Sequence, residues 1–295
     1  MGLNLQEHLF DRGPERRPRR AAYALPMLFT SGNVFLGFLA IIRSFEGALV
    51  ALGGNLGHNA QFEVAAKAIG VAVLLDGLDG RIARLTGTTS DFGREMDSLA
   101  DVISFGVAPA ALALAWGAQF VDGPANPVLQ EYLRRAAYFV GFLFLLCGAV
   151  RLARFNVQKN PVPKNPGRTD RKYFVGLPIP AAAGLVASVV YAADSAPLEF
   201  WPLSVAWLAL LAMLAFLMVS TWRYRSLKDI QLLRPLSPLT VILWGALCYL
   251  VWNFSQPVLL AMACFYVGSG IVVRVGGALR RRLRRLHPEP QRQAG

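Results

Sequence analysis

Four aspartates lie in two pairs on either side of a short polar stretch. Asp76 and Asp79 are three residues apart, and Asp97 and Asp101 are four residues apart. On an α-helix, both spacings place the two side chains on one face. If the intervening "LTGTTSDFG" turns the chain, the two helices become antiparallel neighbours. All four carboxylates can then face a common space, and we treat them as one candidate site.

The chemistry of this candidate site follows from its charge. Ionised carboxylates held close together in an apolar medium repel each other strongly, so they must be partly protonated, paired with cations or bound to metal. The stretch 76–101 contains no His or Cys, and carboxylate oxygens suit magnesium, manganese or calcium. Two such ions about 4 Å apart can assist phosphoryl displacement. Arg84 is the arginine within the spacing that joins the two acidic pairs, whereas Asp91 and Glu95 are interpreted as helix caps.

The elements that carry these residues are expected to cross a membrane. The chain has 295 residues, of which 55% are hydrophobic and only 16% are charged. Several apolar windows reach the length of about 20 residues that a bilayer requires. We predict an all-α, polytopic membrane helix bundle of about eight transmembrane helices, a six-helix catalytic core plus two C-terminal helices. Their expected ranges are 26–50, 62–80, 95–118, 134–156, 174–194, 202–221, 237–253 and 256–276.

The basic residues predict how the bundle is oriented. The formal net charge is +12, but the arginines cluster before the first span and after the last one. This pattern is typical of the positive-inside rule and of contact with anionic headgroups, and no nucleic-acid module accompanies it. We therefore expect a plasma or inner membrane protein with both termini and the active site on the cytoplasmic side, and no nucleic acid as partner.

The same charge pattern divides the chain into four parts. Residues 1–25 are expected to form a basic amphipathic arm with an N-terminal interfacial helix, and residues 26–221 the catalytic core. Residues 222–276 would hold the two additional transmembrane helices, and residues 277–295 a basic disordered tail.

The spacing of the acidic stretch resembles a known signature, that of the CDP-alcohol phosphatidyltransferases. These integral membrane enzymes move a phosphatidyl group from a CDP-linked lipid to a small alcohol and release CMP. The resemblance holds at every fixed position of Asp76-x2-Asp79-Gly80-x2-Ala83-Arg84-x8-Gly93-x3-Asp97-x3-Asp101.

The resemblance implies a role for each matching residue. Two divalent cations, Mg2+ or Mn2+, would be coordinated by the four aspartates, with Asp101 also the catalytic general base. The CDP-diacylglycerol would be held by residues of the signature, its neighbouring loop and the early segment "TSGNVFLGFLAI", namely Gly80, Arg84, Ser90 and Asn33.

Three further segments resemble one branch of the family, the bacterial phosphatidylserine synthases. They are "SFGVAPA", "RLARFN" and "FVGLPIPAAAG". Serine is a zwitterion, so its site needs a cation for the carboxylate. Arg151 and Arg154 lie three residues apart and can grip a carboxylate, and Asn156 can offer amide contacts, although the arginines could equally be membrane anchors.

We therefore expect phosphatidyl transfer from CDP-diacylglycerol to L-serine, by direct displacement, within membrane lipid. A homodimer is left open. The nearest alternative is the same chemistry with glycerol 3-phosphate, inositol phosphate or choline as acceptor. A divalent-cation transporter is a different class of function, and it would need polar residues that continue toward the outer side of the membrane.

Overall fold

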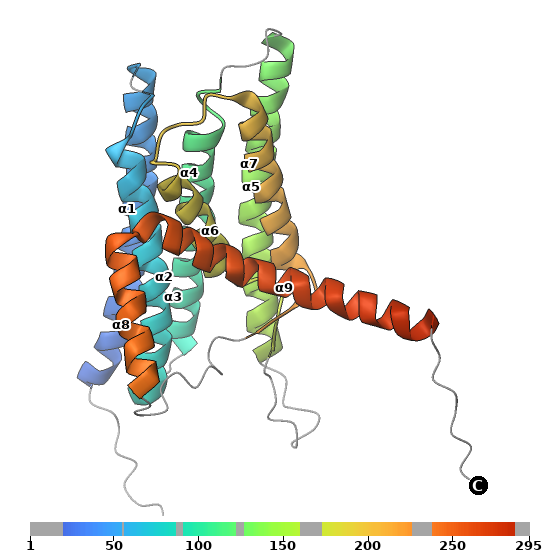
Figure 1. The fold of residues 1–295 in the computed structure, drawn as a ribbon. Helices are drawn as coiled ribbons and strands as arrows, with labels where there is room; N and C mark the ends of the chain where they lie inside the picture. Colours follow the sequence, from blue (N-terminus) through green and yellow to red (C-terminus); the bar gives the residue numbers. More distant parts are fainter. Residues whose placement is uncertain are drawn as a thin grey trace, which may run out of the picture.

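The computed structural model describes residues 20–54, 56–86, 91–121, 127–159, 173–225 and 238–286, and it is built almost entirely of helices (Figure 1). The predicted all-α architecture is therefore confirmed. In chain order the elements are α1 (Arg20–Leu52), α2 (Ala60–Thr86), α3 (Asp91–Asp101), η1 (Val102–Val107), α4 (Ala108–Gly117), α5 (Pro127–Lys159), β1 (Tyr173–Val175), α6 (Ile179–Ala192), α7 (Trp201–Val219), β2 (Arg223–Arg225), α8 (Pro238–Asn253) and α9 (Ser255–Leu286).

Several of these helices suit a bilayer. Five stretches of the described chain are long and apolar enough to cross a membrane: Met27–Leu52, Phe92–Gly117, Gln130–Val157, Trp201–Val219 and Ser255–Arg274. Large apolar side chains such as Phe38 and Phe216, which are 58% and 60% exposed, point away from the bundle. A lipid surround explains that exposure, because such side chains gain nothing from contact with water. The expected count of eight spans is not confirmed.

The helix expected over residues 174–194 begins later than its hydrophobicity suggested. Residues Tyr173–Val175 form β1, which pairs antiparallel with β2. α6 starts only at Ile179, with Pro180 in its first turn, where a missing N–H costs nothing. Between them Gly176 has a φ of +81°, and its N–H donates to the Trp222 carbonyl at 2.8 Å.

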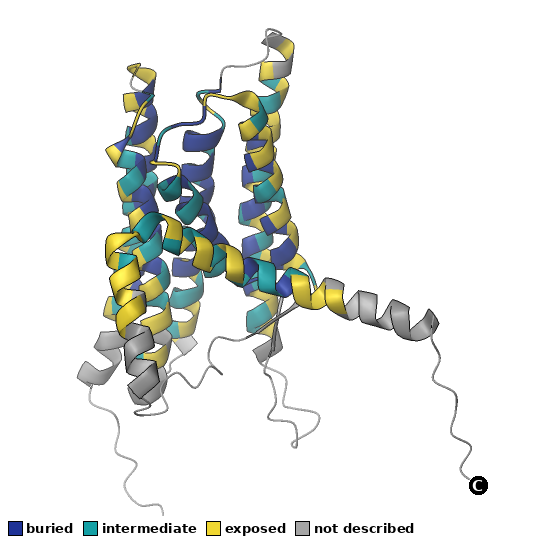
Figure 2. Cartoon of the chain, in the orientation of Figure 1, coloured by how far each residue is buried: buried dark blue, intermediate teal, exposed yellow. Residues whose placement is uncertain are grey.

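The C-terminal helices also depart from a simple bundle. The last helix was expected to end at residue 276, but α9 continues to Leu286. In Figure 1, α9 crosses the other helices instead of running along them. It contacts α6, β2 and α8. Most of its described residues are half-buried or exposed (Figure 2). The call of an interfacial helix in residues 1–25 and that of a disordered tail after 277 fall largely outside the described residues.

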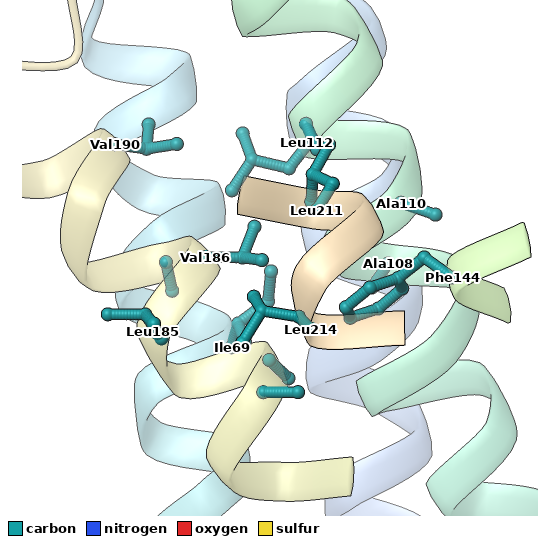
Figure 3. Packing of buried hydrophobic residues seen from close by; sticks show 14 of the residues in the cluster. Ile69, Ala108, Ala110, Leu112, Phe144, Leu185, Val186, Val190, Leu211 and Leu214 are labelled. Atoms are coloured by element: carbon teal, nitrogen blue, oxygen red, sulfur yellow. The ribbon is translucent and has the colours of Figure 1, made fainter. Parts of the chain in front are cut away.

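The core lies between α2, α4, α5, α6 and α7. Figure 3 shows Ile69, Phe144, Val186 and Leu214 converging from four of these helices onto the small side chains of α4. Small residues let the helices approach closely, which is the usual way for membrane helices to gain packing contacts. This packed centre fixes how α2, α3 and α5 are placed relative to one another.

Candidate active site

Three carboxylates from two helices meet at one end of the bundle. Asp76 lies in the C-terminal half of α2, while Asp97 and Asp101 lie one turn apart near the end of α3. One carboxylate oxygen from each lies within 4.8 Å of the others. Asp101 is buried, with 9% of its surface exposed, and the other two are half-buried. The structure thus brings together three of the four aspartates that the spacing placed on a common space.

The remaining signature residues are placed only by their backbone. Asp79, Gly80 and Arg84 lie on α2, one to two turns after Asp76, and their side chains are outside the description. Ser90 falls in residues 87–90, which the structure does not describe. The roles expected for these four residues stay predictions.

A π-helical segment follows Asp101 directly. α3, η1 and α4 form one continuous helical run, and η1 lies between the acidic stretch and the apolar one. π-turns inside longer helices are rare and are frequent at functional sites. Here η1 presents Ser104 to α1, where the hydroxyl of Ser104 donates to the backbone carbonyl of Asn33 at 2.8 Å. Gly37, one turn further along α1, allows this approach, because an added Cβ would lie 2.6 Å from the Ser104 hydroxyl.

Asn33 itself is fully buried at this contact. Its side-chain Oδ1 and Nδ2 have no hydrogen-bond partner among the described residues. Leaving a buried amide unsatisfied costs about 1–3 kcal/mol, so such a group calls for an explanation. A polar ligand next to η1 supplies one, in keeping with the contact to CDP-diacylglycerol that was predicted for Asn33.

One arginine lies beside the carboxylates. Arg151 on α5 is half-buried, and it interacts electrostatically with Asp101, with Tyr266 of α9 and with Asp76, in decreasing order. Its Nε is buried and makes no hydrogen bond within the described part of the chain. Arg154, three residues later, is exposed. The two arginines that were expected to act together therefore have different surroundings.

Asn156 has a protein partner. Its side-chain Nδ2 donates to the hydroxyl of Ser98 at 2.8 Å, and that hydroxyl donates to the Arg94 carbonyl at 3.0 Å. Because Ser98 lies between Asp97 and Asp101, this bond ties α5 to the carboxylate-bearing turn of α3. Sequence reasoning missed Ser98, Ser104 and Tyr266. Ser104 stood in a segment already singled out, whereas nothing local to Tyr266 marks it.

The donor set fits divalent cations. Asp76, Asp97 and Asp101 offer only oxygen atoms, the ligands that magnesium and manganese prefer. They form the single grouping of three potential ligands found among the described residues. One arginine cannot balance three carboxylates at this separation, which favours metal as the balancing charge.

Comparison with known proteins identifies this arrangement. The family model of CDP-alcohol phosphatidyltransferases matches residues 23–222, which include α1 to α7 almost completely. The chain belongs to the CDP-alcohol phosphatidyltransferase family. The carboxylates, Asn33 and Arg151 all lie within the matched part, whereas α8 and α9 lie beyond it.

Within the family, the similar curated proteins include several with one printed activity. A CDP-diacylglycerol–serine O-phosphatidyltransferase of Helicobacter pylori is 36% identical over 214 residues, which cover 72% of this chain and 77% of that protein. The protein of the same name from Saccharomyces cerevisiae is 38% identical over 159 residues, 54% of this chain and 50% of the relative. An archaetidylserine synthase of Methanothermobacter thermautotrophicus is 39% identical over 167 residues, 56% of this chain and 57% of the relative.

Proposed function

We propose that this chain transfers the phosphatidyl group of CDP-diacylglycerol to the hydroxyl of L-serine, giving phosphatidylserine and CMP. The observation that carries the proposal is the cluster of Asp76, Asp97 and Asp101 with Arg151 beside it. The carboxylates fit the pyrophosphate chemistry of the family. Relatives that are named for serine as the acceptor support the choice of serine.

The lipid substrate is held from two sides. Its acyl chains remain among the apolar side chains on the outside of the bundle, and its polar part reaches the cluster. Asn33 offers a buried amide as both donor and acceptor to that polar part. Gly80, Arg84 and Ser90 complete the CDP subsite, because glycine allows close backbone approach and guanidinium pairs with phosphate.

Asp76, Asp79, Asp97 and Asp101 would hold two divalent cations, Mg2+ or Mn2+. Bound there, the ions neutralise the pyrophosphate and stabilise the charge that develops on the departing CMP.

The protein supplies the base for the displacement. Serine's hydroxyl oxygen attacks the β-phosphorus in line with the bond to CMP, the new P–O bond forms, and the bond to the CMP oxygen breaks. Asp101 accepts the hydroxyl proton, which lets the alcohol attack without forming a free alkoxide. Burial of Asp101 suits this role because it raises the basicity of a carboxylate.

The acceptor is oriented by its carboxylate. Arg151 can bind it bidentately from beside Asp101, so that the serine hydroxyl is held near the base. Arg154 is exposed and remains available to attract anionic substrates. Asn156, which is bound to Ser98, acts by holding α3 in place, although contact with the serine headgroup was the earlier expectation.

An acceptor panel tests the proposal. Purified protein in detergent–lipid micelles is given CDP-diacylglycerol and Mg2+ or Mn2+ with serine, glycerol 3-phosphate, inositol phosphate or choline in separate reactions. We expect CMP and phosphatidylserine with serine alone, and no product after chelation of the metal. Product with another alcohol but not with serine would assign the chain to a different branch. Metal flux into liposomes without CMP release would favour the transporter.

The sidedness of the site is a second part of the proposal. The cluster lies at the end of the bundle where α2 ends and α3 begins, and Glu199, between α6 and α7, is exposed near the opposite ends of those helices. In a variant with Cys147, Cys248 and Cys264 replaced, an impermeant thiol reagent should label Glu199→Cys in intact cells. Arg94→Cys should react only after permeabilisation. The reverse pattern would invert the proposed orientation.

A further inference from the structure

We propose that α9, which lies outside the part of the chain that matches the family, completes the acceptor subsite through Tyr266. In this arrangement Tyr266 positions Arg151 so that its guanidinium faces the carboxylate of serine. The inference rests on the proposed function, because it assumes that Arg151 binds the acceptor.

The first step is the placement of α9. Near its start, the hydroxyl of Ser255 is hydrogen-bonded to the hydroxyl of Tyr191 on α6 at 2.8 Å. Further along, Leu260, Ala263 and Tyr266 are half-buried and pack against the core, and Val267 is only 3% exposed. Spacings of three and four residues keep these side chains on one helix face. α9 is thus seated on the bundle by a defined face, and Figure 2 shows its buried patch where it crosses.

The second step is the contact with the active site. Tyr266 belongs to this seated face, and it interacts electrostatically with Arg151, as Asp101 and Asp76 do. Arg151 therefore has partners from three helices: α2, α3 and α9. A guanidinium left with carboxylate partners alone is drawn toward them and away from an incoming anion. A phenol oxygen on the other side gives it an uncharged partner that holds its plane without competing for the charge.

The third step is the consequence for the substrate. Arginine binds a carboxylate best when two parallel N–H groups of its fork are presented together, and a rotated fork loses one of them. Tyr266 would act through this orientation, so it is a positioning residue. Its effect belongs to the acceptor, whereas the CDP-diacylglycerol site on α1, α2 and α3 lies within the matched part of the chain.

The test is Tyr266→Phe, which removes only the hydroxyl. The matched control is Tyr249→Phe on α8, where the tyrosine is 65% exposed. We expect the KM for serine to rise about tenfold in Tyr266→Phe, the loss expected for one hydrogen bond to a charged group. The KM for CDP-diacylglycerol and kcat should stay within about twofold, and Tyr249→Phe should match the wild type. An unchanged KM for serine, or a fall in kcat alone, would overturn the inference.

A double-mutant cycle tests whether Tyr266 acts through Arg151. In an Arg151→Lys background, the ammonium has no fork to orient, so adding Tyr266→Phe should change the KM for serine by less than about twofold. A full tenfold additional rise would show that Tyr266 acts independently of Arg151, which contradicts the inference.

The two proposals fail differently. If wild-type protein makes no phosphatidylserine, the proposed function fails before Tyr266 is tested. If the wild type uses serine and Tyr266→Phe has an unaltered KM, only the inference about α9 fails. Partial misfolding does not confuse the result, because it lowers the amount of active enzyme and leaves the KM of the folded fraction unchanged.

Discussion

Asp101 differs from Asp76 and Asp97 in its burial, and at the scale of single residues this difference assigns their tasks. All three carboxylates can bind a cation, but a buried one is held back from water and is the better proton acceptor. The spacing of the aspartates alone could not make this distinction. It predicted which acids share a face, but the burial of each depends on the helices that pack around it.

Replacing Asp101 by Asn tests the assigned base. The variant should lose at least about a hundredfold in kcat, because general-base catalysis typically contributes that much or more. It should keep most of its binding of CDP-diacylglycerol, measured with a radiolabelled lipid. Glu95→Gln, at an exposed acid on the same helix, should retain activity. Turnover by Asp101→Asn near that of the control would remove Asp101 from the role of base.

Asn156 and Ser98 form a pair whose partners can be tested against each other. If Asn156 acts by tying α5 to α3, Ser98→Ala should reproduce the effect of Asn156→Ala, and each should lower the unfolding free energy by about 1 kcal/mol. Thermal unfolding and serine kinetics would be measured for both. A large rise in the KM for serine in Asn156→Ala alone would instead support direct contact with the substrate. Sequence reasoning could not reveal this bond, which joins residues 58 positions apart.

At the scale of elements, the contact between α1 and η1 is the tightest constraint on the site. It brings Asn33 next to the segment that follows Asp101, and it depends on the absence of a side chain at Gly37. The sequence placed a helix over both regions correctly. It could not predict the π-turn or the close approach, because both arise from packing between helices about 70 residues apart.

Gly37→Ala should push α1 away from η1. Its Cβ would lie 2.8 Å from the Ser104 Cα, which is backbone and cannot move aside alone. Overpacking of this kind costs about 1–3 kcal/mol, and activity should fall as Asn33 shifts. Gly70→Ala on α2, where an added Cβ meets nothing within 4 Å, is the control and should unfold like the wild type. Equal thermal stability and activity in the two variants would contradict the importance of this contact.

At the scale of the whole molecule, charged side chains join helices at the end far from the carboxylates. His58, between α1 and α2, donates from Nδ1 to the backbone carbonyl of Asp194 at 2.9 Å, and its Nε2 lies 3.3 Å from Glu63. Glu63 also pairs with Lys67. The pKa of His58 is raised, mainly by the hydrogen bond to the Asp194 backbone and also by the two carboxylates, while desolvation opposes the shift.

This raised pKa predicts a pH dependence of stability. The charged imidazolium stabilises the fold, so the contribution is fully present below the ordinary histidine pKa of about 6.5 and is lost as pH rises through the higher folded value. Thermal unfolding in detergent should show this loss in the wild type. His58→Gln cannot titrate, so its profile should be flatter over the same range. Identical profiles for the two proteins would exclude His58 as the group responsible.

The path of α9 shows where sequence reasoning reached its limit at this scale. An apolar run of suitable length predicts burial in lipid or protein, but it does not give a direction. The run over 256–276 was therefore expected to be one more span, whereas α9 crosses the bundle and brings Tyr266 to Arg151 (Figure 1). The acidic signature was readable because its partners are close in sequence. The contribution of α9 was not, because 115 positions separate Tyr266 from Arg151.

The π-turn after Asp101 also sets the phase of the long helix that contains it. An α-helix advances about 100° per residue, and a π-turn takes up roughly one residue more than an α-turn. The acidic half of the helix is therefore rotated relative to its apolar half. This offset lets Asp97 and Asp101 face the site while Leu112 and Trp116 stay buried in the core. A one-residue deletion within η1 would keep every catalytic side chain and turn the acidic face away from its partners.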